Sequence, residues 1–351
     1  MKTSGVIDNF RNTIAHGEQS YEPIRIEKFR RDVSLEGNWR VDATFDVVWR
    51  EHRIRCLAEV KGRSTPRLVR TAASQIRDVA EATEEEWCPV IIVPHLTDGV
   101  VEELRRADVS GIDLNGNYLM LCDELLAIRL DRPNEYPESR PIKKIYSRRS
   151  SLVGRFLLSE PRIFEQVGEI HQGIRERNGE VSLATVSKVL NRLDEELLIE
   201  KRRGAIRLLQ PRKLLDRLRD GYRAPEFVDT VKVKLPDEAE GELLGELFGE
   251  HWMWSGETSA EKYTVTTPPT VGVVYTRSPL PHNQLEEFED SRFYNTIVSR
   301  TEDTYIYFDR RGRWASPVET YLALSRLDKR ERQLGRAIRD NRILSEFGGD
   351  V

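Results

Sequence analysis

A carboxylate and an ammonium group stand two residues apart in the triplet Glu59-Val60-Lys61, which ends the apolar run IRCLAEVKG. In a β-strand alternate side chains share a face, so Glu59 and Lys61 point to one side while Val60 points into the packing. Asp42 lies upstream in a second β-rich segment. Two carboxylates at one strand end can hold Mg²⁺, a hard ion that prefers oxygen ligands. We therefore expect Asp42 and Glu59 to form a site for Mg²⁺ or Mn²⁺.

Two paired strands would position these groups. Residues 41–49 and 54–60 have the composition of strands, and the polar residues 50–53 between them predict a turn. Antiparallel pairing across that turn brings Asp42 near Glu59. Asp46 lies on the same strand face as Asp42 and is the alternative first acid, although the spacing favours Asp42.

The competing interpretation of the triplet is a solvated surface charge pair. Charged residues make up 32% of the chain, so a Glu-x-Lys triplet arises easily by chance. The apolar neighbours Leu57, Ala58 and Val60 instead place the charges at the end of a buried strand. An unpaired ionised group is costly there without a metal or a partner.

This arrangement resembles the PD-(D/E)xK nuclease superfamily, which includes restriction endonucleases and archaeal Holliday-junction resolvases. The match covers about the first third of the chain and implies an α/β restriction-endonuclease-like domain with Mg²⁺-dependent DNA endonuclease activity. In that family the two acids bind the metal, which corresponds here to Asp42 and Glu59, and we expect the Val60 carbonyl to be a further ligand. Lys61 would orient or activate the attacking water. Val41 stands where the family motif has proline.

The segments after the triplet extend the α/β pattern. Residues 65–82 predict a helix, and the same resemblance places Gln75 where some branches of the superfamily have a glutamine facing the site. A short buried strand at 88–96 and a helix capped by Thr97 or Asp98 follow. The turn Asn115-Gly116-Asn117 then joins two paired strands.

We assign residues 1–132 to this nuclease-like domain. Residues 133–146, with three prolines in RPNEYPESRP, are the expected linker.

The middle of the chain predicts a winged helix-turn-helix over residues 147–222. Three segments with apolar residues at helical spacing cover 150–161, 163–179 and 182–199, the last with a Ser182 cap, and a short basic hairpin follows. In this fold the third helix enters the major groove of DNA. Its apolar residues can face the core, namely Leu183, Val186, Val189, Leu190 and Leu193. Its polar residues are the candidate DNA contacts, namely Thr185, Ser187, Lys188, Asn191 and Arg192.

The charge distribution supports nucleic-acid binding in the middle of the chain, although the formal net charge is −4. All charged residues from Arg140 to Arg155 are basic, and Asp216 is the single acid between Lys201 and Arg219. The hairpin residues expected to meet DNA phosphates are Lys201, Arg202, Arg203 and Arg207. A winged helix used only for protein docking is the competing interpretation. The segment from Asp237 to Glu250 carries acidic charges alone, so it is not expected to contact DNA.

Residues 223–351 contain no recognisable catalytic pattern, and we expect an α+β domain. WMWSGETSAEKYTV predicts an exposed or interfacial aromatic cluster followed by a helix, residues 270–276 and 303–310 predict strands, and residues 315–344 predict helices.

From about Ser150 to Leu344 the chain resembles the type IV abortive-infection antitoxin family AbiEi, on the segments SSLVGRFLL, VSLATVSKVLNRL, WSGETSAEKY and ASPVETYLALSRLDKRERQLGRAIRD. The family joins a winged helix to an antitoxin domain, represses its own operon and counteracts a nucleotidyltransferase toxin, which implies a role in phage defence.

Length and composition set further bounds. A chain of 351 residues is expected to form two or three domains. It has no long apolar run, and its amino terminus lacks the layout of a signal peptide, which favours a cytoplasmic protein without membrane contact. Cys56, Cys88 and Cys122 are isolated in apolar segments, so we expect buried thiols rather than zinc ligands or a disulfide.

Two functions stay open at this point. In the first, the winged helix delivers a Mg²⁺-dependent endonuclease to DNA. In the second, the nuclease-like domain only binds DNA, and the chain is an antitoxin-like transcriptional repressor. DNA is the expected partner in both, and a toxin or another protein would bind the carboxy-terminal domain. A homodimer also remains open.

Overall fold

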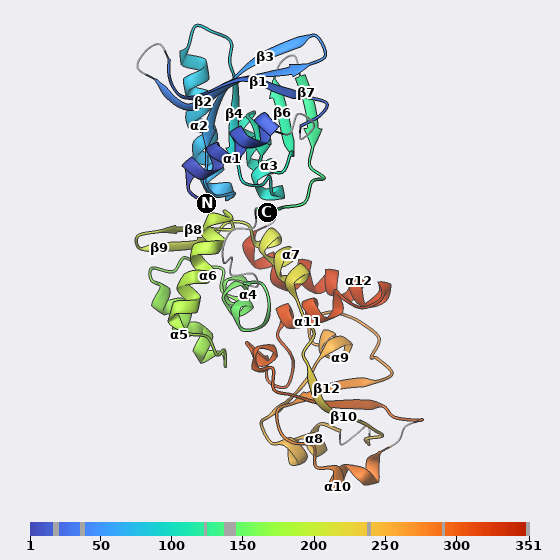
Figure 1. Ribbon diagram of the computed structural model, residues 1–351. Helices are drawn as coiled ribbons and strands as arrows, with labels where there is room; N and C mark the ends of the chain where they lie inside the picture. Colours follow the sequence, from blue (N-terminus) through green and yellow to red (C-terminus); the bar gives the residue numbers. More distant parts are fainter. Residues whose placement is uncertain are drawn as a thin grey trace. The chain divides into compact units, whose positions relative to one another are not determined.

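The structure is a computed structural model of the chain. It describes residues 1–16, 21–35, 39–122, 125–136, 145–236, 240–289 and 292–348. The chain divides into two compact units. Unit 1 comprises Met1–Pro141 with Glu195–Leu197, and unit 2 comprises Ile142–Asp194 with Leu198–Val351. Each unit is an assembly of helices and strands around its own core (Figure 1).

Unit 1 is built on one mixed, seven-stranded sheet in the order β1-β2-β3-β4-β5-β6-β7. β1 to β3 form an antiparallel meander, β3, β4 and β5 run parallel, and β6 and β7 return antiparallel. The turn that joins β2 to β3 is shorter than predicted, since His52 and Arg53 belong to β3 and only Arg50 and Glu51 lie between the strands. The Asn115–Asn117 turn joins β5 to β6. The strands are β1 (Arg25–Ser34), β2 (Arg40–Trp49), β3 (His52–Val60), β4 (Cys88–Val93), β5 (Ser110–Asp113), β6 (Tyr118–Cys122) and β7 (Leu125–Arg129).

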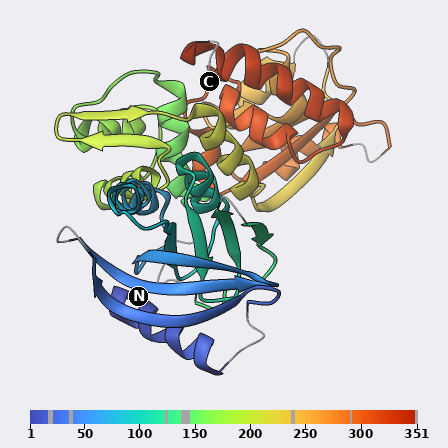
Figure 2. The same cartoon turned by 90° about the horizontal axis from the view of Figure 1, so that it is seen from above.

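Helices cover both faces of this sheet, so unit 1 has three layers (Figure 2). α1 (Thr3–His16) packs Val6, Ile7 and Phe10 against one face. α2 (Pro66–Ala82) and α3 (Asp98–Ala107) pack on the other, against strand residues that include Leu57 and Ile91. Thr97 caps α3, because its side chain accepts a hydrogen bond from the Val100 amide. The parallel β3-α2-β4-α3-β5 segment brings three strand ends to one edge of the sheet.

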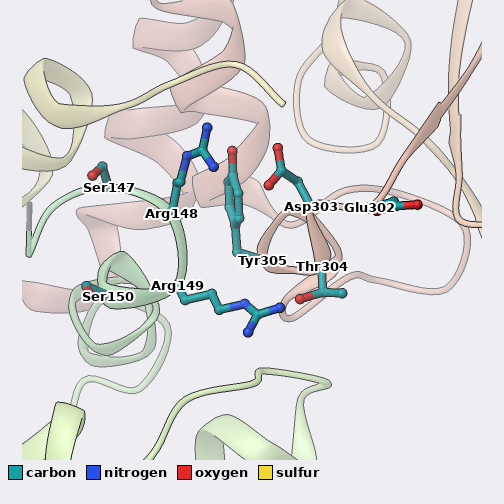
Figure 3. Close-up of a pocket in the computed structure, with 8 residues that line it drawn as sticks. All are labelled: Ser147, Arg148, Arg149, Ser150, Glu302, Asp303, Thr304 and Tyr305. Carbon is teal, nitrogen blue, oxygen red and sulfur yellow. The ribbon is translucent and has the colours of Figure 1, made fainter. Parts of the chain in front are cut away.

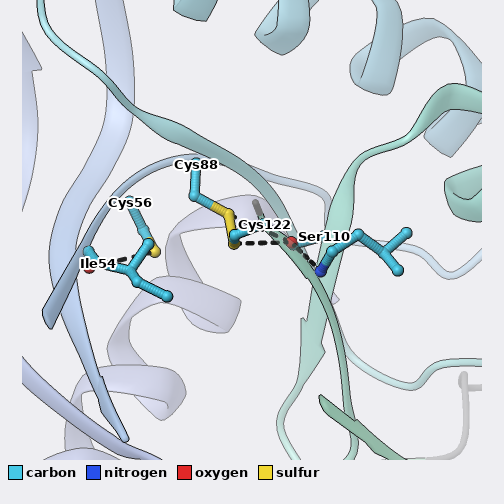
Figure 4. The surroundings of a disulfide bond; sticks show 6 residues. Ile54, Cys56, Cys88, Ser110 and Cys122 are labelled. Atoms are coloured by element: carbon cyan, nitrogen blue, oxygen red, sulfur yellow. Dashed lines mark hydrogen bonds between the residues drawn. A yellow bond between two sulfur atoms is a disulfide. The ribbon is translucent and has the colours of Figure 1, made fainter. Parts of the chain in front are cut away.

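The prediction of three buried thiols is wrong for two of them. Cys88 on β4 and Cys122 on β6 form a disulfide with a Cα–Cα distance of 5.8 Å (Figure 4). The Ser110 hydroxyl, on the strand between them, lies 3.3 Å from the Cys88 sulfur. Cys56 remains a free buried thiol, and burial raises its pKa. The two bonded cysteines are 34 residues apart, so their proximity follows from the strand order and not from local spacing.

Unit 2 begins with three helices and a hairpin. A 3-10 turn η2 (Arg148–Ser151) leads into α4 (Leu152–Ser159), which is followed by α5 (Val167–Glu176) and α6 (Leu183–Glu195). β8 (Ile199–Arg202) and β9 (Ala205–Leu208) then pair as a two-stranded sheet, and α7 (Pro211–Gly221) follows. These elements appear in the order predicted for a winged helix. Most of the predicted linker lies outside the described residues.

The rest of unit 2 contains a four-stranded sheet in the order β10-β13-β12-β11. The strands are β10 (Phe227–Val233), β11 (Trp252–Trp254), β12 (Gly272–Thr276) and β13 (Thr296–Thr301). Shorter helical elements interrupt them, namely α8 (Glu240–Phe248), α9 (Gly256–Ala260), α10 (His282–Leu285) and η3 (Glu286–Phe288). The chain continues through η4 (Thr304–Tyr307), α11 (Pro317–Leu324), α12 (Lys329–Ile338), the π-helical turn η5 (Arg339–Ile343) and η6 (Ser345–Phe347).

Two predictions for this region are wrong. Trp252 and Trp254 are buried in the sheet core rather than exposed. Residues 303–310 form no strand, because Thr304–Tyr307 is the 3-10 helix η4, whose aromatic side chains are buried on all sides. The helix after the tryptophans, strand β12 and the final helices are confirmed.

A buried ion pair joins the two parts of unit 2. Arg155 of α4 and Glu319 of α11 are 1% and 0% exposed, and Arg155 Nη1 donates to Glu319 Oε2 at 2.5 Å. The Tyr222 hydroxyl donates to the other oxygen of Glu319 at 2.8 Å. One hydrophobic core surrounds this pair and contains residues of α4 to α7 together with residues of η4, α11 and α12. Among the described residues, no helix has the length and apolarity needed to cross a membrane.

Candidate active site

Asp42 and Glu59 lie at the neighbouring ends of β2 and β3. The antiparallel register ends with Ala43 opposite Ala58, and Asp42 and Glu59 are the next residues on the two strands. Directly opposed residues of an antiparallel pair project to the same face, with Cβ atoms about 5 Å apart. Ala43 and Ala58 share one face of the sheet, so Asp42 and Glu59 project to the other.

The main chain of the triplet fixes the position of the Asp42 carboxylate. The Lys61 amide donates to the Ile92 carbonyl at 2.9 Å, so it belongs to the β3–β4 ladder. The Val60 amide points to the opposite side of the strand and donates to Asp42 Oδ2 at 2.8 Å. A strand residue directs its carbonyl to the same side as its amide, so the Val60 carbonyl also faces Asp42.

Lys61 and Glu59 form an ion pair on the same face. Lys61 Nζ donates to Glu59 Oε1 at 2.7 Å, and the two side chains are 24% and 26% exposed. The pair is thus half-buried at the end of β3, accessible from solvent. Its ammonium group lies where a positive charge can meet an anionic substrate.

The donor atoms fit a hard divalent cation. Within the described part of the chain, Asp42 Oδ1 and Glu59 Oε2 accept no hydrogen bond, and both belong to carboxylates. Mg²⁺ is held in proteins through one or two carboxylates and keeps several waters. No group of three or more histidine, cysteine, aspartate or glutamate side chains with metal-site geometry occurs among the described residues, so this carboxylate pair would depend on main-chain and water oxygens.

The alternative acid Asp46 occupies a different place. Its register partner is Arg55, four positions along β3 from Glu59. Asp46 is 7% exposed and forms ion pairs with Lys28 at 3.0 Å and Arg53 at 2.7 Å. Burial alone would raise the pKa of Asp46, but these hydrogen-bonded cations hold it below its usual value. The negative charge of Asp46 is therefore neutralised by Lys28 and Arg53. This geometry favours Asp42 as the first ligand.

Gln75 is not brought into contact with these three residues. It lies on the exposed side of α2, nine residues after Pro66. At a rise of 1.5 Å per residue this is about 13 Å along the helix. Within the described residues Gln75 forms no hydrogen bond to Asp42, Glu59 or Lys61. Its role stays a prediction.

The five predicted DNA contacts of α6 are all exposed or half-buried. Ser182 caps the helix, because its hydroxyl accepts from the Thr185 amide at 3.2 Å. Lys188 and Asn191 are exposed, while Thr185, Ser187 and Arg192 are half-buried. Four of the five predicted core residues are buried, namely Val186, Val189, Leu190 and Leu193. Leu183 is 49% exposed, because it is the first residue of the helix.

The hairpin presents its basic residues beside α6. We call Lys201, Arg202, Arg203 and Arg207 the wing cations. Lys201 Nζ donates to Asn191 Oδ1 at 2.6 Å, which links the wing to the helix. Glu200 pairs with Arg202 at 2.5 Å and with Arg207 at 3.7 Å, so part of the basic charge is balanced inside the wing.

Sequence reasoning missed a polar network at the ends of β4 and β5. Asp113 is 0% exposed, and its carboxylate accepts hydrogen bonds from the amides of Leu96, Asn115 and Asn117 at 2.9, 2.8 and 2.9 Å. His95 Nδ1 lies 3.1 Å from Asp113 Oδ2. The signal that could have found it is an aspartate that ends one buried strand and a histidine that follows another.

A pocket of about 400 Å³ lies in unit 2 between η2 and η4 (Figure 3). Two arginines line it, and each forms an ion pair with a residue that does not: Arg148 with Glu226 and Arg149 with Glu180. These pairings leave no obvious catalytic set. We therefore place the candidate active site in unit 1.

In comparisons with known proteins, no family model matches the sequence, and no curated protein does either. The case for a function consequently depends on the geometry of the site.

Proposed function

We propose that the chain is a DNA-binding protein whose unit 1 is a Mg²⁺-dependent DNA endonuclease of the restriction-endonuclease-like type. The observation that carries this proposal is that Asp42 and Glu59 meet at the triplet, with the Val60 amide bonded to Asp42 and Lys61 paired with Glu59. This is the set of groups that the nuclease resemblance assigns to the metal and to the attacking water.

Each residue has a separate task in phosphodiester hydrolysis. Asp42, Glu59 and the Val60 carbonyl would hold Mg²⁺ or Mn²⁺. Such an ion, when bound, supplies Lewis-acid polarisation of a phosphoryl oxygen and acidifies water. Lys61 carries a positive charge that can position the nucleophilic water and stabilise negative charge developing on the phosphate. The Val60 amide keeps the Asp42 carboxylate oriented toward the triplet.

Unit 2 would supply most of the DNA affinity. The exposed residues of α6 offer hydrogen-bond donors for base edges, and the wing cations offer charge for phosphates. Contacts with phosphates give affinity without sequence preference, whereas Asn191 and Arg192 would influence which sequence is bound.

A cleavage assay tests the enzyme proposal. Wild type should cut at least one of duplex, single-stranded and branched DNA when Mg²⁺ or Mn²⁺ is added, and EDTA should abolish cleavage. Glu59→Ala should keep its fold and DNA affinity but lose cleavage, because it removes a metal ligand. Asp46→Asn is the matched control, since it changes a carboxylate on the same face of β2 that the proposal leaves outside the site. Equal loss in both variants would point to a general fold defect instead.

The second candidate function is an antitoxin-like transcriptional repressor, cytoplasmic and able to bind a toxin through the carboxy-terminal part of unit 2. The exposed α6 face beside a basic hairpin favours it, because operator binding needs nothing more. Absence of cleavage on all three substrates, combined with tight binding of one discrete operator, would select the repressor and exclude the endonuclease.

A further inference from the structure

The strands next to the candidate site carry a second polar group at the same sheet edge. β4 pairs with β5 in parallel, with Val93 opposite Asp113, and the Lys61 amide binds the Ile92 carbonyl of β4. Lys61, Val93 and Asp113 therefore form one row across three adjacent strands and share a face. Strands lie about 4.8 Å apart, so Lys61 and Asp113 are separated by about 10 Å.

Asp113 is held as a charged, immobile acceptor. It is fully buried, and burial by itself would raise its pKa, but hydrogen bonds from His95 and Asn117 and from main-chain amides hold the pKa below its usual value. The Asn117 side-chain amide contributes one of these bonds at 2.7 Å. Because an ionised carboxylate only accepts hydrogen bonds, the facing His95 Nδ1 must carry a proton and donate it.

His95 is fixed from both neighbouring strands. Its main-chain amide donates to the hydroxyl of Ser64, in the loop after Lys61, at 2.9 Å. Its Nδ1 faces Asp113 on the β5 side. Nε2, on the opposite edge of the ring, therefore points away from β5. In the described part of the chain Nε2 has no hydrogen-bond partner, and the side chain is 22% exposed.

A purely structural role accounts for only part of this arrangement. The bonds from Asn115 and Asn117 are those of a turn that joins two strands. The turn does not require a partly exposed imidazole whose Nδ1 is hydrogen-bonded to Asp113 while Nε2 has no partner among the described residues. In α/β sheets, ligands bind at the carboxyl ends of parallel strands, which is where His95 lies.

We propose that His95 Nε2 binds a phosphate group of the DNA strand that is cut at Asp42 and Glu59. Asp113 is its positioning residue, since it fixes the ring without contacting DNA. The inference rests on the proposed endonuclease function and adds a second phosphate contact to it.

The first test observes the ring directly. The full-length protein is labelled with ¹⁵N-histidine, and the Nε2 signal of His95 is assigned as the one that disappears in His95→Gln. Addition of DNA in the presence of Ca²⁺ should shift this signal. The control is His282, which forms a similar pair with Asp229 at 2.7 Å in unit 2 and is 56% exposed. Its signal should not move. A His95 signal unchanged at saturating duplex, single-stranded and branched DNA would overturn the inference.

The second test uses cleavage kinetics. His95→Gln should raise KM about tenfold, because it removes a hydrogen bond to a charged group, while kcat changes little, because the contact exists in both ground and transition states. A single neutral methylphosphonate at the contacted position should cause the same loss in wild type and no further loss in His95→Gln. In His282→Gln the methylphosphonate should cost as much as in wild type. If a methylphosphonate at every position lowers cleavage by the same factor in His95→Gln as in wild type, the two effects are independent and the contact is refuted.

The outcomes separate the two proposals. If wild type cuts none of the DNA substrates, the endonuclease fails, and the histidine signals alone decide whether His95 binds DNA. If wild type cuts DNA while both His95 tests are negative, only the phosphate contact fails. Thermal unfolding checks the fold of His95→Gln, and His95→Asn replaces it if that variant is unstable.

Discussion

The ion pair between Lys61 and Glu59 should compete with metal binding. Lys61 Nζ lies 2.7 Å from Glu59 Oε1. A metal ion about 2.1 Å from its ligand oxygen would lie roughly 4 Å from that ammonium. At the dielectric constant of water, the repulsion between a divalent ion and a single positive charge at this distance is about 2 kcal/mol. This energy corresponds to a factor of about 30 in Kd.

Lys61→Met should therefore bind Mn²⁺ more tightly than wild type, by about tenfold because a flexible lysine can move partly aside. The same variant should lose cleavage, since its ammonium is proposed to act on the water and the phosphate. Isothermal titration with Mn²⁺ measures the first effect. Lys28→Met is the matched control, because Lys28 pairs with Asp46 in the same sheet and its loss should leave Mn²⁺ affinity unchanged. Unchanged or weaker Mn²⁺ binding by Lys61→Met would refute the reasoning.

Three further predictions concern binding and stability. Alanine at all four wing cations should weaken binding to many DNA sequences and reduce the slope of log K against log salt by up to about 0.9 for each lost phosphate contact, measured by fluorescence anisotropy; an unchanged slope would indicate protein docking instead. Arg155→Met should destabilise unit 2 by about 3–5 kcal/mol in urea, because it leaves a buried charge unpaired, and adding Glu319→Leu should recover part of the loss. Asp113→Asn should cost about 1.5–3 kcal/mol at neutral pH through weaker hydrogen bonds. The pKa of Asp113 is lower in the folded protein than in the unfolded chain, where it is about 3.9. The ionised carboxylate therefore stabilises the fold above that pH, and this stabilisation is lost in more acidic solution. The difference in unfolding free energy between wild type and Asp113→Asn should shrink below about pH 3.9.

The sequence was most informative where local patterns decide the structure. The strand composition on either side of residues 50–53 predicted the β2–β3 hairpin, and alternation then placed Glu59 and Lys61 on one face. Helical spacing predicted α6, and the Ser182 hydroxyl caps it as expected. These features depend on side chains within a few residues of one another.

Features that depend on distant packing were missed. The cysteines of β4 and β6 meet beyond the first residue of β5, a position that depends on the strand order and that no local spacing encodes. The aromatic residues of η4 have the composition of a strand, yet burial on all sides allows a 3-10 turn. The His95–Asp113 pair likewise exists because β4 and β5 are parallel neighbours, so its two halves are far apart in sequence.

The most direct test of the account is the position of a bound metal ion. Anomalous diffraction from crystals of the full chain soaked in Mn²⁺ requires no knowledge of the DNA substrate. We expect a Mn²⁺ peak between the carboxylates of Asp42 and Glu59, close to the Val60 carbonyl, and no such peak in Glu59→Ala. A peak at Asp46, or none at Asp42 and Glu59 under saturating Mn²⁺, would contradict the proposed metal site and the endonuclease function built on it.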